Sequence, residues 1–215
     1  PNNINMIKQK IFSFKFNNKF NQTNFYVNAT NIKAYQGIFN SKNKNILLIG
    51  PNKSGKTFLS KIWQDKFNAI KFHNNNFEYI IDNFRNVVID NLNTNYSEES
   101  LFHILNHCKL NDLKSLIISN CEIDEISFKL NDLISRLKSM IYLKINHPDD
   151  DMLINLLTKF FIEKQFIVNS NNVFEFIIKN IDRTYENILD IVEKLDNLSI
   201  EKKRQLTIPL IKEIL

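Results

Sequence analysis

One loop of the chain has the residue types and the spacing needed to bind phosphate groups. The pattern G-x-x-x-x-G-K-[ST] of phosphate-binding loops is matched by Gly50-Pro51-Asn52-Lys53-Ser54-Gly55-Lys56-Thr57. The glycines let backbone N–H groups turn inward around phosphate oxygens, and the following helix adds the positive end of its dipole. We expect Lys56 to reach the β- and γ-phosphates of a nucleotide and the Thr57 hydroxyl to hold Mg²⁺. The residues expected to contact the nucleotide are Gly50, Asn52, Lys53, Ser54, Gly55, Lys56, Thr57 and Phe58.

The neighbours of this loop distinguish it from a glycine–serine turn without a ligand. A continuous apolar run, Ile46–Ile49, precedes the loop as a buried parallel strand would, and helical spacing follows over Thr57–Phe67. The chain has three glycines, and all but Gly37 stand at the two positions that the pattern requires. The sequence therefore predicts a site for ADP or ATP and does not distinguish between them.

An acidic residue ends the apolar run Val87–Ile89. We expect Asp90 to lie beside the phosphate-binding loop and to hold Mg²⁺ together with Thr57; a simple turn residue is the alternative. The next residue is Asn91, whose amide cannot take a proton from an attacking water. The general-base contribution, on the order of 10²–10⁴-fold, should then be missing. We therefore expect weak or no intrinsic ATPase activity.

Two other residues could act on a γ-phosphate. Asn120 follows the apolar run Leu116–Ile118, at the place of the sensor 1 residue of AAA+ ATPases. Arg136 precedes the last predicted strand and is one of four arginines in a lysine-rich chain. A planar guanidinium there would suit an arginine finger that acts in trans on a neighbour's nucleotide, where such a group is worth about 10³–10⁵ in rate. A surface salt bridge is the alternative for Arg136.

These residues require a scaffold of alternating strands and helices. Strands are predicted at Ile46–Ile49, Ala69–Phe72, Val87–Ile89, Leu116–Ile118 and Met140–Ile145. Helices are predicted at residues 25–41, Thr57–Phe67, Phe77–Phe84 and Ser97–Lys109. This alternation predicts an α/β fold in which helices flank both faces of a parallel sheet.

The pattern changes after His147-Pro148, beyond which only helical spacing occurs. The helices are expected at Asp149–Gln165, Asn171–Asn180, Asp182–Leu195 and Ile208–Leu215. We therefore expect an N-terminal arm over residues 1–24, an α/β nucleotide-binding core over residues 25–147 and an all-α lid over residues 148–215.

The composition is that of a globular protein with a moderate basic excess. The formal net charge is +5, but Asp and Glu are interspersed with Lys, which favours a solvated surface over a DNA-binding face. Cys108 and Cys121 lack metal-ligand spacing and suggest buried thiols in a reducing compartment. No run approaches 18 apolar residues, so we expect a cytoplasmic protein that makes no membrane contact.

The order of these motifs resembles the Hda family, AAA+ proteins homologous to the bacterial replication initiator DnaA. The resemblance rests on the phosphate-binding loop, on Val88-Ile89-Asp90-Asn91, on Ser135-Arg136-Leu137 and on the final segment Arg204–Leu215. It implies an AAA+ P-loop core with a helical lid, bound Mg²⁺ and activity in the ADP form. It also implies that Arg136 stimulates hydrolysis of DnaA-bound ATP and so prevents over-initiation of chromosome replication. Self-association into a homo-oligomer is a further option.

The same resemblance implies that a short pattern in the N-terminal arm is a clamp-binding peptide. Family members bind the DNA polymerase sliding clamp through a glutamine followed by spaced hydrophobic residues. Gln9, Phe12 and Phe14 stand at those positions, whereas Lys10 departs from the usual leucine. An extended segment would present the amide and two aromatic rings to an apolar pocket. A chance group of aromatic residues in an arm is the alternative.

One lid residue departs from the family pattern, and two other functions compete with the regulatory one. Glu186 stands where the family has a phosphate-contacting arginine, so either Arg183 replaces that arginine from another direction or the contact is absent. The competing functions are a DNA-remodelling ATPase or helicase loader of the DnaC type and a small P-loop kinase. A kinase needs several cations around the transferred group, and four scattered arginines do not provide them.

Overall fold

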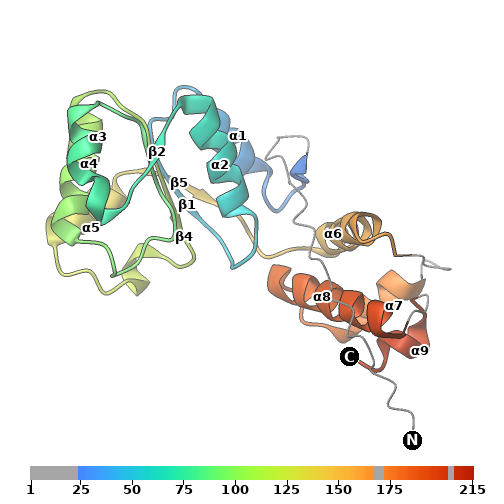
Figure 1. Ribbon diagram of the computed structural model, residues 1–215. Helices are drawn as coiled ribbons and strands as arrows, with labels where there is room; N and C mark the ends of the chain where they lie inside the picture. Colours follow the sequence, from blue (N-terminus) through green and yellow to red (C-terminus); the bar gives the residue numbers. More distant parts are fainter. Residues whose placement is uncertain (1–23, 167–171, 203–205) are drawn as a thin grey trace, which may run out of the picture.

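The computed structural model describes residues 24–166, 172–202 and 206–215. These residues form an α/β core and a group of helices built from the C-terminal third of the chain (Figure 1). Gln9, Phe12 and Phe14 of the expected clamp-binding peptide lie outside the described residues. Their role therefore stays a prediction.

Within the described residues, five parallel strands form one sheet in the order β2-β3-β4-β1-β5. The strands are β1 (Asn45–Ile49), β2 (Ile70–Lys71), β3 (Val87–Ile89), β4 (Ser115–Ser119) and β5 (Ile141–Lys144). β4 lies between the other two strands that carry site residues, with Ser119 beside Ile49 and Ile117 beside Ile89. The carboxyl ends of β1, β3 and β4 therefore meet at one edge of the sheet, and the predicted parallel α/β fold is confirmed.

Helices cover both faces of this sheet, because alternate side chains of each strand point to opposite sides. The helices of the core are α1 (Ile32–Phe39), α2 (Lys56–Phe67), α3 (Phe77–Asp82), α4 (Glu98–Leu110) and α5 (Asn131–Lys138). α3, α4 and α5 pack on the face that carries Leu47 and Ile117, whereas α1 and α2 pack on the face that carries Ile46 and Leu116. Burial on both faces explains why β1, β3 and β4 contain continuous apolar runs, whereas the edge strands β2 and β5 include exposed residues.

The remaining helices build an apolar core of their own, which confirms the all-α C-terminal part. They are α6 (Asp150–Glu163), α7 (Asn172–Asn180), α8 (Tyr185–Lys202) and α9 (Ile208–Ile211). Leu157, Ile177 and Ile188 are fully buried at the centre of this group. Met152 and Tyr185 instead belong to the buried cluster on the α1/α2 face of the sheet, so the first turns of α6 and α8 attach the helical group to the core.

The fold differs from the sequence prediction in several places. The helix predicted over residues 25–41 is confined to Ile32–Phe39, and the last helix ends at Ile211 and not at Leu215.

The helix α5 is not predicted, because it has no side-chain cap of its own. The two residues before it are held from outside: the Glu98 carboxylate on α4 accepts hydrogen bonds from the backbone N–H groups of Lys129 and Leu130. Cys121 is partly exposed rather than buried, since it follows the end of β4, whereas Cys108 is buried as expected.

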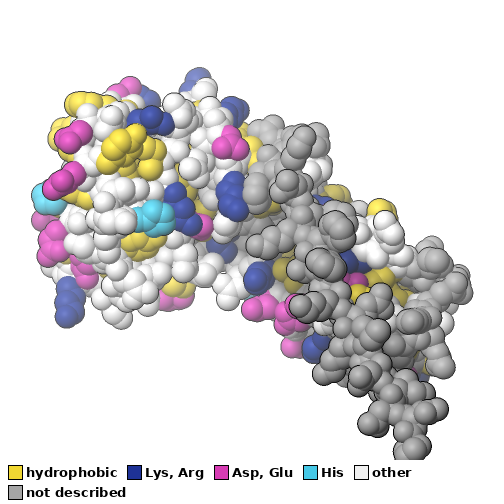
Figure 2. All heavy atoms as spheres, viewed as in Figure 1, with side chains coloured by type: hydrophobic (Ala, Val, Ile, Leu, Met, Phe, Trp, Pro, Cys, Tyr) yellow, Lys and Arg dark blue, Asp and Glu magenta, His cyan; other side chains and the backbone are white. Residues whose placement is uncertain are grey.

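Charged side chains of both signs are mixed on the face of the core that Figure 2 shows. Surface lysines stand beside acids, as in the pairs Lys44–Asp112 and Lys138–Asp124. The fields of two opposite charges this close largely offset one another at a distance, and salt screens the remainder. These pairs therefore favour a solvated surface over a basic face. Among the described helices, none combines the length and the apolar character that crossing a membrane requires.

Candidate functional site

The phosphate-binding loop joins the carboxyl end of β1 to the first turn of α2. Gly55 immediately precedes α2 with a φ of 88°, in the left-handed region that favours glycine. A β-carbon on Gly55 would lie 2.7 Å from Cε2 of Phe25, and one on Gly50 would lie 2.9 Å from Cβ of Ile145. Gly50 is therefore required by close neighbours that include backbone, whereas Gly55 is required mainly by its backbone conformation, because the Phe25 ring could shift.

Lys56 is folded under this loop. Its Nζ donates hydrogen bonds to the carbonyl oxygens of Gly50 at 2.8 Å and of Pro51 at 2.6 Å. Burial lowers the pKa of the Lys56 ammonium to about 8, although the nearby Asp90 carboxylate acts in the opposite direction. A phosphate oxygen could replace these carbonyl contacts and supply a full negative charge to a poorly solvated ammonium.

Asp90 at the end of β3 lies next to Thr57 at the start of α2. The Thr57 hydroxyl donates to Asp90 Oδ1 at 3.2 Å, and Lys71 Nζ lies 3.1 Å from Asp90 Oδ2. The Asp90 side chain is 12% exposed, and the Tyr96 hydroxyl donates to the Asp90 backbone oxygen at 2.9 Å. A hydroxyl and a carboxylate are the oxygen ligands that Mg²⁺ prefers, so the predicted pair Thr57 and Asp90 fits this metal.

Two asparagines close the same edge of the sheet. Asn120 follows β4, and its Nδ2 donates to Oδ1 of Asn91 at 3.3 Å. Asn91 has a φ of 60°, a left-handed conformation that asparagine tolerates better than most residues. The position after Asp90 is therefore filled by an amide that is already hydrogen-bonded to the predicted sensor 1 residue.

A cavity of about 640 Å³ connects these groups. It is lined by Asn52, Lys53, Gly55, Lys56, Thr57, Asp90, Asn91, Ile118, Asn120 and Glu186. The structure thus brings together most of the predicted phosphate, metal and sensor residues, and it adds a carboxylate from the lid. Glu186 faces this cavity from α8, as its place in the family pattern implied. Arg183 is not among the residues that line this cavity, and its guanidinium pairs with Asp150 at 3.3 Å.

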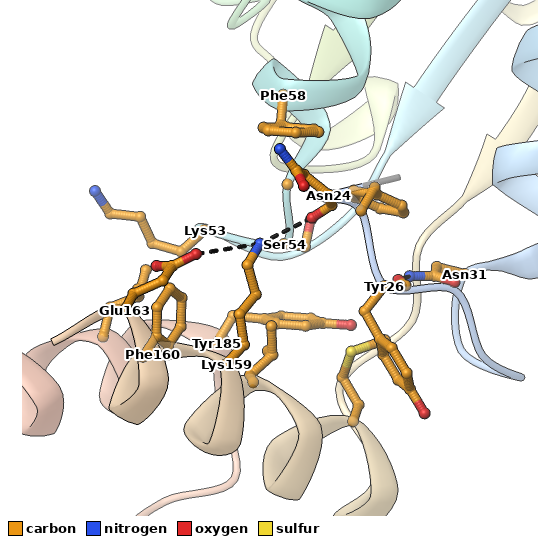
Figure 3. A pocket seen from close by; sticks show the side chains of 15 residues that line it. Asn24, Tyr26, Asn31, Lys53, Ser54, Phe58, Lys159, Phe160, Glu163 and Tyr185 are labelled. Carbon is orange, nitrogen blue, oxygen red and sulfur yellow. Dashed lines mark hydrogen bonds and ion pairs between the residues drawn. The ribbon is translucent and has the colours of Figure 1, made fainter. Parts of the chain in front are cut away.

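A second, more apolar pocket of about 200 Å³ lies on the other side of the loop, between the core and the lid (Figure 3). Ser54 and Phe58, both predicted site residues, line it. The Phe25 ring stacks on Phe58 with 6.1 Å between the ring centroids. The lining residues that sequence reasoning missed come from the segment before α1 and from α6 and α8, and they include Phe25, Tyr26, Asn31, Met152, Phe160 and Tyr185.

Polar contacts tie the segment before α1 to the lid above this pocket. Lys159 on α6 donates to the backbone oxygen of Asn24 at 2.8 Å and lies 3.8 Å from Glu163, as the dashed lines of Figure 3 show. The Tyr26 hydroxyl donates to Asp151 at 2.9 Å. The pocket is therefore closed by groups from core and lid together.

Arg136 lies at the opposite edge of the sheet. A small pocket there is lined by Arg136 together with Asn45 and Ser115, the first residues of β1 and β4. Arg136 is half-buried, and its Nη2 donates to Oδ1 of Asn106 on α4. Its Nε is buried and finds no hydrogen-bond partner among the described residues. The structure thus keeps this guanidinium away from the phosphate-binding loop of its own chain.

Comparisons with known proteins connect both parts of the chain to replication initiators. Residues 150–215 match the family model described as Hda, lid domain. The chain is 27% identical over 234 residues to the chromosomal replication initiator protein DnaA of Buchnera aphidicola subsp. Cinara cedri, an alignment that covers 94% of the chain and 53% of that protein. The chain spans about half the length of the curated relatives it matches.

Solved structures of DnaA share the fold. Domain III of the Thermotoga maritima protein superposes with a TM-score of 0.75 at 17% identity and covers 93% of this chain and 96% of that one. The AMPPCP-bound DnaA of Aquifex aeolicus gives a TM-score of 0.67 at 17% identity, with coverage of 86% and 67%.

The motif order, the fold and these matches agree with one another. At such low identities, the structural matches show the fold, which is an AAA+ α/β core with a C-terminal helical lid. The sequence matches confirm the relation to DnaA and, over the lid, the resemblance to the Hda family. The chain is therefore related in sequence to DnaA, has the fold of an AAA+ core with a helical lid, and matches the lid domain of Hda over residues 150–215.

Proposed function

We propose that the chain binds an adenine nucleotide and uses it to regulate a partner, with little ATP hydrolysis of its own. The phosphates would lie in the cavity beside Lys56, and Mg²⁺ held by Thr57 and Asp90 would neutralise part of their charge. The adenine ring would occupy the pocket beside Phe25 and Phe58, which offers aromatic faces for stacking. The A. aeolicus protein, which has the same fold, is bound to AMPPCP, and this supports nucleotide binding by the chain.

The residue after Asp90 is the observation that carries the regulatory part of the proposal. Asn91 lines the phosphate cavity, and its side-chain oxygen already accepts a hydrogen bond from Asn120. An amide at this position can orient a water but cannot take its proton, so the general-base contribution is lost. A site that holds a nucleotide without turning it over suits a protein whose bound ADP stabilises an active form.

The partner would be DnaA itself, with Arg136 as an arginine finger. Because Arg136 lies at the sheet edge opposite its own phosphate-binding loop, it can act only on the nucleotide of another molecule. The guanidinium would first leave Asn106, which forfeits one hydrogen bond worth about 0.5–1.5 kcal/mol. Stimulated hydrolysis of DnaA-bound ATP would limit further rounds of chromosome replication. Self-association could place the same finger on a second copy.

The N-terminal arm over residues 1–24 would supply the second interaction. Gln9, Phe12 and Phe14 would insert into the polymerase sliding clamp and bring the core and lid to replicating DNA. A pull-down with the clamp should lose most of its signal in a variant with alanine at all three positions. Equal recovery of variant and wild type would remove the clamp from the proposal.

A hydrolysis assay with DnaA tests the finger. We expect Arg136→Ala to bind ADP like wild type and to lose most of the stimulation of DnaA-bound ATP hydrolysis, about 10³-fold or down to background. Lys138→Ala is the matched control, because Lys138 is an exposed cation of the same helix that pairs with Asp124. Unchanged stimulation by Arg136→Ala would refute the assignment. Rapid ATP turnover by the isolated chain would instead favour a DNA-remodelling ATPase of the DnaC type.

A further inference from the structure

The Lys71 ammonium lies beside the Asp90 carboxylate of the candidate metal site. Lys71 ends the short edge strand β2, which pairs with β3 in a register that sets this residue beside Val88. Lys71 Nζ lies 3.1 Å from Oδ2 of Asp90, which is two residues after Val88 and directly follows β3. The lysine side chain is 44% exposed, whereas the aspartate side chain is 12% exposed. The carboxylate is thus poorly solvated, and it gains more from a cation than a surface acid would.

Both oxygens of this carboxylate have partners within the chain. Oδ1 accepts the hydrogen bond of the Thr57 hydroxyl, and Oδ2 faces Lys71. The Tyr96 hydroxyl donates a hydrogen bond to the Asp90 backbone oxygen, which also helps to hold Asp90 in place. A divalent cation between Thr57 and Asp90 would have to share this carboxylate with the ammonium and would be repelled by it.

We propose that Lys71 is a resident cation that competes with Mg²⁺ for Asp90, so that ADP binding at this site depends only weakly on the metal. The inference rests on the proposed nucleotide site and adds a regulation of that site. A lysine suits this role because its compact charge sits on a flexible stem, and its exposed position lets it swing toward or away from the acid. ADP lacks the γ-phosphate, so the ammonium can balance Asp90 while the β-phosphate is held by the loop and Lys56.

The test compares the affinity for ADP in magnesium chloride and in EDTA by isothermal titration calorimetry. For wild type, we expect the two dissociation constants to agree within about threefold. For Lys71→Met, the site loses its resident cation, and Mg²⁺ should strengthen ADP binding by about tenfold or more. Lys71→Arg keeps the positive charge and should restore a ratio close to that of wild type.

Lys44→Met is the matched control. Lys44 forms an exposed ion pair with Asp112 and immediately precedes β1, at the sheet edge opposite the phosphate-binding loop. Lys44→Met removes the same charge as Lys71→Met and a comparable surface ion pair. The ratio of the ADP dissociation constants in EDTA and in magnesium chloride should therefore stay at the wild-type value. A change in this variant equal to that of Lys71→Met would show that net charge, and not the contact with Asp90, sets the metal dependence.

The outcomes separate this inference from the proposed function. A wild-type protein that binds ADP with the same strong metal dependence as Lys71→Met overturns the role of Lys71 and leaves the nucleotide site in place. A Lys71→Arg variant that behaves like Lys71→Met overturns the charge argument. If wild type binds ADP in neither buffer, the proposed nucleotide site fails, and the inference fails with it.

Discussion

Replacing Asn91 with Asp should place a proton acceptor at the position directly after Asp90. Asn91 follows Asp90 at the carboxyl end of β3 and lines the cavity proposed for the phosphates. Its φ of 60° lies in the left-handed region, which Asp tolerates about as well as Asn. The substitution therefore exchanges an amide for a carboxylate without new backbone strain, and the hydrogen bond from Asn120 can persist.

The size of the effect follows from the neighbours of the new carboxylate. A general base contributes on the order of 10²–10⁴-fold, or about 2.7–5.4 kcal/mol of barrier lowering. The new charge would stand next to Asp90 and share its cavity with Glu186, and like charges disfavour ionisation of one another. The hydrogen bond from Asn120 would also occupy one of its oxygens. We therefore expect the lower end of the range, about 10²-fold faster hydrolysis.

Single-turnover hydrolysis of ATP, with protein in excess over nucleotide, is the appropriate assay. The extra negative charge should weaken ATP binding, and saturating protein separates this effect from the chemical step. Asn95→Asp makes the same chemical change at an exposed position four residues away, outside the residues that line the cavity, and should leave the rate unchanged. An Asn91→Asp variant that binds ATP but hydrolyses it at the wild-type rate would refute the argument that a missing acid limits turnover.

Three other substitutions or modifications follow from the same geometry. Gly55→Ala should lower the free energy of unfolding, measured by urea titration, by about 1–2 kcal/mol through its left-handed φ alone. The double variant with Phe25→Ala should lose less stability than the sum of the two single variants, because the new β-carbon meets the Phe25 ring. Glu186→Gln should tighten ATP binding about two- to tenfold, since a charge facing the phosphate cavity is removed, and fluorescence titration with a labelled ATP would measure it. Burial raises the pKa of Cys108 to about 12, so its reactive thiolate is scarce near neutral pH; mass spectrometry after iodoacetamide treatment should find Cys121 modified in the folded protein and Cys108 only after unfolding.

The parts of the fold that the sequence predicts correctly are those that depend on local patterns. Ile46–Ile49 and Val87–Ile89 are apolar on consecutive residues because helices bury both faces of the sheet, so their strands can be recognised without knowing the partners. Ser97 caps α4 through its own side chain, which accepts from the backbone N–H of Ser100, and this signal also lies within a few residues. The phosphate-binding loop is local in the same sense.

The features that the sequence does not predict depend on contacts between distant segments. The two residues before α5 are held by Glu98, which is more than 30 residues earlier in the chain, and the helix has no side-chain cap that could serve as a start signal of its own. Lys71 is an unremarkable residue at a strand end until the pairing of β2 with β3 places it against Asp90. No spacing rule within the sequence connects either pair.

The two halves of the candidate nucleotide site differ in the same way, and this difference has a physical cause. The phosphate half needs backbone N–H groups in one tight turn, so its residues must be consecutive, and a motif can identify them. The half beside Phe25 needs only apolar and aromatic surface, which side chains from any segments can supply once the fold brings them together. Here Phe25, Phe58, Phe160 and Tyr185 come from four separate segments of core and lid. A change in the position of the lid would therefore remove Phe160 and Tyr185 from this pocket, whereas the consecutive residues of the phosphate-binding loop would stay together.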